Sequence, residues 1–167
     1  IVHRPVRIAT RLGVFAAVAA SEELIFRGYL FGLLEHRWGR RSALGVTSVA
    51  FAAMHLFNPG ATAVSLASVA AAGLLLGAVR LATGSVVAAF LAHLAINWVQ
   101  AVIFRLPVSG LELGRPPGFR MEAIGPAWLT GGRWGLEGGV VAAAAFLVIS
   151  FLLLGVRPPT EGGPRRR

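Results

Sequence analysis

Five long apolar stretches, separated by short breaks rich in glycine, proline or arginine, constrain the fold of this chain most. They cover residues 8–34, 43–57, 61–81, 85–106 and 139–156. A helix crosses the hydrocarbon core of a bilayer in ~20 apolar residues, and a backbone in lipid must satisfy its own hydrogen bonds. The pattern therefore predicts an all-α fold, a polytopic transmembrane helical bundle with about five membrane segments.

The composition agrees with a membrane protein. Charged residues make up 14% of the chain, against about 25% in soluble domains, and the mean hydropathy is +0.71. The net charge of +9 comes from arginines at the edges of the apolar stretches and in the tail 165–167, as expected near anionic lipid. No basic patch with interleaved aromatics occurs, so we expect no nucleic-acid partner. The absence of cysteine excludes disulfides and a thiol nucleophile.

We expect one integral-membrane domain over residues 1–156, with a bacterial inner membrane as its location because the composition is typical of a GC-rich bacterial genome. The glycine- and proline-rich stretch 107–138 predicts an interfacial loop, with Trp128 and Trp134 at the headgroup level. The basic tail 157–167 is expected to be disordered.

Several polar side chains interrupt the apolar stretches, at a cost of ~2.5–3.5 kcal/mol each for an ionisable group at the centre of a bilayer. They are Glu22, Glu23, Arg27, His55, His93 and Asn97. Glu23 and Arg27 are four residues apart and can pair on one helix face. Glu22 is rotated by about 100° from Glu23, so we expect the two carboxylates to face different partners, with Glu22 pointing into the bundle.

These residue types suit a peptidase that activates water without a serine or cysteine nucleophile. A buried carboxylate can act as a general base, one histidine can hold the water, and a second histidine with an asparagine can form an oxyanion hole. Glu22, His55 and His93 could instead bind zinc, and the residues alone leave both mechanisms open. Taken singly, each motif also has a purely structural interpretation, such as an ion pair, a helix-end histidine bonded to a carbonyl, or a hydrogen bond between helices.

Together, three motifs are more specific. EELIFR (22–27) fits Glu-Glu-x-x-x-Arg, FAAMH (51–55) fits Phe-x-x-x-His, and HLAIN (93–97) fits His-x-x-x-Asn. Their order and spacing resemble the CPBP family of intramembrane proteases, which includes type II CAAX prenyl endopeptidases and bacterial proteins linked to bacteriocin processing and self-immunity. The resemblance covers about residues 20–100.

The resemblance implies a role for each motif residue. Glu22 would be the general base that activates water together with His55, and His93 and Asn97 would form the oxyanion hole. Glu23, Arg27 and Phe51 would support the site. The resemblance implies a reaction without a cofactor, and a zinc-dependent reaction is the alternative. Full members usually have further N-terminal spans, so we expect either the core of a larger bundle or a short member.

The function expected from the resemblance is an intramembrane endopeptidase that cleaves a membrane-associated protein or peptide. Two alternatives use the same polar cavity. One is a non-catalytic membrane immunity or scaffold protein that binds a peptide there. The other is a proton-coupled transporter in which the buried glutamate and histidines relay protons.

Overall fold

The computed structural model describes residues 3–112 and 124–155, and the regular structure in these ranges is helical. The main helices are α1 His3–Glu23, α2 Phe31–Met54, α3 Ala63–Thr83, α4 Val86–Trp98 and α6 Val140–Leu154. The shorter elements are the π-helices η1 Leu24–Leu30 and η2 Val99–Ile103, the one-turn helix α5 Ala127–Thr130, and the 3-10 turns η3 Gly132–Trp134 and η4 Leu136–Gly138. The predicted all-α class is confirmed.

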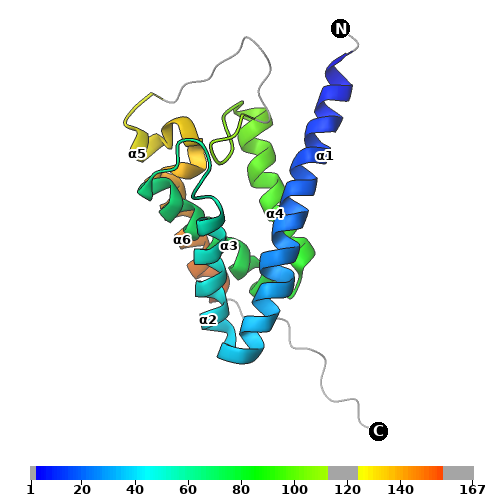
Figure 1. Cartoon of the computed structure of the whole chain (residues 1–167), viewed down its shortest axis with the longest axis vertical. Coiled ribbons are helices and arrows are strands. Elements are labelled where there is room, and N and C mark those ends of the chain that lie inside the picture. The colour runs from blue at the N-terminus through cyan, green and yellow to red at the C-terminus, as the bar shows by residue number, and fades with distance from the viewer. Residues whose placement is uncertain (1–2, 113–123, 156–167) are drawn as a thin grey trace.

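The first two apolar stretches form two helical arms joined by a sharp bend. α1, η1 and the start of α2 run on without interruption, and the chain then reverses at Gly39, where φ is +80° and ψ is 168°. Glycine adopts this conformation at no steric cost. Figure 1 shows α1 descending to the bend and the second part of α2 rising from it, away from α1. The predicted segments 8–34 and 43–57 correspond to these two arms.

Helix α3 is the central element of the bundle, since it packs against α2, α4 and α6. Its start is fixed by a capping box in which Thr62 and Ser65 satisfy each other's backbone N–H groups. It ends at Gly84, which is left-handed with φ +69°. Gly73 of α3 faces Ser48 of α2, so the two helices approach closely there.

Replacing Gly73 with alanine is expected to separate α2 from α3. A Cβ at this position would lie 3.0 Å from Ser48 Cα and 3.3 Å from Ser48 O, which are backbone atoms that cannot rotate away. We expect a loss of about 1–3 kcal/mol in the free energy of unfolding, measured by SDS titration in mixed micelles. Gly45→Ala is the matched control, because a Cβ there meets nothing within 4 Å. Equal stabilities of the two variants would contradict the close packing.

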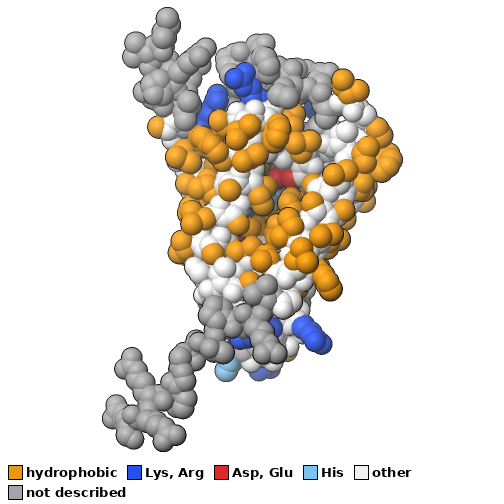
Figure 2. Space-filling model, turned by 180° about the vertical axis from the view of Figure 1, so that it is seen from behind, with side chains coloured by type: hydrophobic (Ala, Val, Ile, Leu, Met, Phe, Trp, Pro, Cys, Tyr) orange, Lys and Arg blue, Asp and Glu red, His pale blue; other side chains and the backbone are white. Residues whose placement is uncertain are grey.

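Two helical stretches are long and apolar enough to cross a membrane within the described residues, Ala63–Thr83 and Val86–Ile103. Helix α6 is apolar but shorter, and the first arm, which ends at the Gly39 bend, carries glutamates and arginines along its length. Large apolar side chains are exposed on α1, α2, α4 and α6, among them Val49, Val87 and Phe151. Figure 2 shows such side chains as an apolar belt across the middle of the face that it draws, with cations near the two ends.

The loop 107–138 corrects one sequence interpretation. Trp128 is exposed, but Trp134 is fully buried in an apolar cluster with Phe26, Phe51 and Val69, and so does not mark the membrane surface. The loop folds back onto α3 through η3 and η4, since η4 contacts that helix. The predicted disordered tail 157–167 lies outside the described residues.

Candidate active site

Glu22, His55, His93 and Asn97 come together around one cavity of about 200 Å³. Glu22 lies at the end of α1, His55 directly follows α2, and His93 and Asn97 lie one turn apart on α4. His55, His93 and Asn97 are each less than 10% exposed. Three motifs separated by some thirty to forty residues therefore share one buried polar space, as the sequence predicts.

His93 bridges the two adjacent glutamates. Its Nδ1 donates to Glu23 Oε1 at 2.9 Å, and its Nε2 lies 3.7 Å from Glu22 Oε2. The expectation that the two carboxylates face different partners is therefore wrong. The helical rotation between them stands, but an imidazole has nitrogens on two sides of its ring, and one histidine inserted from α4 can meet both.

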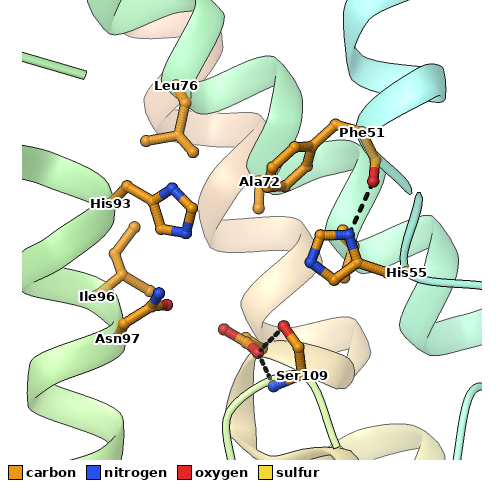
Figure 3. A pocket seen from close by; sticks show the side chains of 10 residues that line it. Phe51, His55, Ala72, Leu76, His93, Ile96, Asn97 and Ser109 are labelled. Atoms are coloured by element: carbon orange, nitrogen blue, oxygen red, sulfur yellow. Dashed lines mark hydrogen bonds between the residues drawn. The ribbon is translucent and has the colours of Figure 1, made fainter. Parts of the chain in front are cut away.

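His55 is held by its own helix. Its Nδ1 lies 2.8 Å from the carbonyl oxygen of Phe51, one turn earlier. A carbonyl oxygen can only accept, so Nδ1 carries the proton, and Nε2 of the neutral ring is left as the acceptor. The structural interpretation of His55 as a helix-end histidine is correct, and the same bond fixes the ring where it lines the cavity. Figure 3 shows this bond, with His93 and Asn97 on the opposite side.

Arg27 and Glu23 form a fully buried ion pair behind the cavity. Arg27 Nη1 donates to Glu23 Oε1 at 2.9 Å, and Nη2 donates to the carbonyl oxygen of Gly73 in α3, also at 2.9 Å. The guanidinium lies 4.5 Å from the centre of the Phe51 ring, a favourable cation–π distance. Phe51 also makes an edge contact with the His93 ring at 5.9 Å between centroids. The supporting residues thus tie η1, α2, α3 and α4 together.

The structure adds one acid that sequence reasoning missed. Glu137 of η4 is buried and lines a second, smaller cavity of about 30 Å³, which it shares with His55, His93, Asn97 and Ser109. Its Oε1 accepts hydrogen bonds from the backbone N–H and the hydroxyl of Ser109. Burial raises the pKa of Glu137, and the bonds from Ser109 partly oppose this. The signal available in the sequence was a lone acid within the glycine-rich stretch TGGRWGLEGG.

The comparison with known families agrees with this geometry. The sequence model described as "Type II CAAX prenyl endopeptidase Rce1-like" matches residues 5–99, more than half of the chain. The chain belongs to this family. No curated protein and no solved structure gives a significant match. The matched range includes all three motifs and therefore Glu22, His55, His93 and Asn97.

Members of the Rce1-like family are membrane-embedded, which agrees with the two long apolar helices and the apolar belt of Figure 2. The match ends before the loop that carries Ser109 and Glu137. These two residues are therefore part of the cavity in this structure without being part of the matched region.

The residues around the cavity do not fit a metal site. Among residues 3–112 and 124–155, no three histidine, cysteine, aspartate or glutamate side chains form a group that could hold a metal ion. The zinc set Glu22, His55 and His93 is thus not assembled as metal ligands among the described residues.

Proposed function

We propose that this protein is an intramembrane endopeptidase of the CAAX type, which hydrolyses a peptide bond of a membrane-associated protein or peptide. The observation that carries the proposal is the convergence of Glu22, His55, His93 and Asn97 on one cavity of about 200 Å³ among apolar helices. A water molecule occupies ~30 Å³ in the liquid, so the cavity can admit water together with part of an extended peptide.

In the proposed reaction, Glu22 is the general base. Its Oε2 is buried and has no hydrogen-bond partner in the described structure, so it is free to accept a proton from water. The water oxygen then bonds to the carbonyl carbon of the substrate, and the carbonyl oxygen becomes negative. His55 Nε2 can accept the second hydrogen of the water and so orient it. Glu22 finally returns the proton to the amide nitrogen as the C–N bond breaks.

In this proposal, His93 and Asn97 stabilise the negative oxygen. The Asn97 amide supplies N–H donors, and His93 directs Nε2 toward Glu22 and the cavity because its Nδ1 is bound to Glu23. When the ring carries both protons, Nε2–H donates to the oxyanion. Fixed donors in a water-poor site stabilise developing charge more than the same groups in water. The proposal requires neither a cofactor nor a metal.

We further propose that the protein is integral to the bacterial inner membrane, with about five membrane segments and lipid around its apolar belt. Its partners would be the bilayer and a membrane-associated peptide or protein substrate, with no nucleic acid.

The proposal can be tested with purified protein in liposomes and a fluorogenic peptide that ends in a farnesylated Cys-aliphatic-aliphatic-X tail. We expect cleavage that releases the tail, identified by mass spectrometry of the products. Lack of cleavage by the wild-type protein, in membranes and across neutral pH, would overturn the CAAX-type assignment. Binding of the peptide without cleavage would favour the immunity or scaffold alternative, and proton flux without cleavage would favour the transporter.

A further inference from the structure

The segment Pro107–Leu111 forms a wall of both cavities. Ser109 lines the two cavities, and Val108 and Leu111 line the larger one together with Glu22. The segment is a tight turn in which Val108 and Leu111 pair with each other. Ser109 has φ +48°, a left-handed conformation that is costly for a residue other than glycine and persists only where surrounding contacts enforce it.

Glu137 supplies two of these contacts. Its Oε1 accepts the Ser109 backbone N–H and, at 2.8 Å, the Ser109 hydroxyl. From the other side, Asn58 Nδ2 donates to the Ser109 carbonyl oxygen at 2.9 Å. Figure 3 shows Ser109 at the cavity with both of its bonds to the carboxylate as dashed lines.

Glu137 is itself rigidly held. Its backbone N–H donates to Gln100 Oε1 at 3.0 Å, and its carbonyl oxygen accepts from the Ser68 hydroxyl of α3. Glu137, Gln100 and Ser68 are all buried. The carboxylate is therefore a fixed acceptor, because the backbone of Glu137 is bonded to η2 and α3. Through its bonds to Ser109, it fixes the cavity wall relative to these two elements.

We propose that Glu137 is a positioning residue of the candidate active site, which holds the Ser109 wall at the distance from Glu22 that the bound peptide requires. The inference rests on the proposed function, because it assumes that the larger cavity receives a peptide. It assigns to Glu137 a hydrogen-bonding role toward Ser109 and no direct part in the chemistry.

This role predicts different effects for two substitutions of Glu137. Glu137→Ala removes the acceptor and leaves the partly buried Ser109 N–H unpaired, so the turn must move. Glu137→Gln keeps a carbonyl oxygen at the position of Oε1 and can accept both bonds. A role through negative charge would instead predict equal losses in the two variants, since both substitutions remove the charge.

The test measures binding of the farnesylated peptide by fluorescence anisotropy in a Glu22→Gln background, where no cleavage is expected. Glu137→Ala should raise Kd at least about tenfold, because the two partly buried Ser109 donors lose their acceptor and the cavity wall moves. Glu137→Gln should stay within about threefold of the parent. Glu35→Ala, which removes an acid paired with Arg40 at the surface, should leave Kd unchanged.

The same role can be measured by kinetics in proteins that keep Glu22. Glu137→Ala should raise KM by a larger factor than it lowers kcat, and Glu137→Gln should restore both values. Hydrogen exchange should be faster at the Ser109 and Gly110 amides in Glu137→Ala and unchanged in Glu137→Gln. Wild-type Kd in the alanine variant, or an equal loss in both variants, would overturn the inference. If the peptide binds with the expected pattern but the Glu22-intact protein does not cleave it, the proposed function fails and the inference about Glu137 stands.

Discussion

Glu22→Gln is expected to lower the rate of peptide cleavage by about 10²–10⁴-fold, the range that a general base contributes. Glutamine has the same size and keeps one oxygen, but it cannot take a proton from water. Glu22 has a buried oxygen without a hydrogen-bond partner in the described structure, and it faces the cavity with His93. The measurement is kcat on the fluorogenic farnesylated peptide in liposomes.

The control for this variant is Glu35→Gln, in which the altered acid lies at the surface beside Arg40 and should leave kcat unchanged. Glu22→Gln and Glu35→Gln should unfold at the same midpoint in SDS titration, because Glu22 does not take part in the buried ion pair. Full activity of Glu22→Gln on a substrate that the wild type cleaves would remove Glu22 from the mechanism.

Arg27→Ala is expected to have the largest effect on stability, a loss of about 3–5 kcal/mol in the free energy of unfolding, typical of a broken buried ion pair. Both side chains of the pair are fully buried. Removing the guanidinium leaves the Glu23 carboxylate without its cation and removes the side-chain donor to the Gly73 carbonyl oxygen. The measurement is SDS titration in mixed micelles, with unfolding monitored by circular dichroism.

Arg40→Ala breaks a second arginine–glutamate pair, Arg40–Glu35, in which the Arg40 side chain is largely exposed. This control should cost less than about 1 kcal/mol. Arg27→Lys should recover only part of the loss, since a single ammonium cannot make two divergent bonds in the geometry of a guanidinium. A midpoint for Arg27→Ala close to that of Arg40→Ala would show that the buried pair does not hold the bundle together.

The helical class and the motif residues could be predicted because they depend on local properties. Apolar runs bounded by breakers such as Asn58-Pro59-Gly60 and Thr83-Gly84 predict helices and their ends, and the structure places helices at all five predicted stretches. The Glu23–Arg27 pair follows from a spacing of four residues on one helix. The roles of Glu22, His55, His93 and Asn97 in catalysis stay predictions.

The partners of His93 and the position of Glu137 could not be predicted, because they depend on how separate helices meet. The ring of His93 reaches both Glu22 and Glu23 only because α4 packs against α1. Likewise, Trp134 and Glu137 belong to a glycine-rich loop that reads as surface, and they are buried because that loop folds onto α3.

The sequence by itself thus determined an all-α chain with polar motifs on apolar helices and a place in the Rce1-like family. The tertiary structure alone decided that these motifs share one cavity, that one histidine serves two carboxylates, and that a distant glutamate fixes the cavity wall. The physical reason is that periodicity and hydropathy act within a segment. Contacts between segments depend on packing, which the pattern of one segment does not encode.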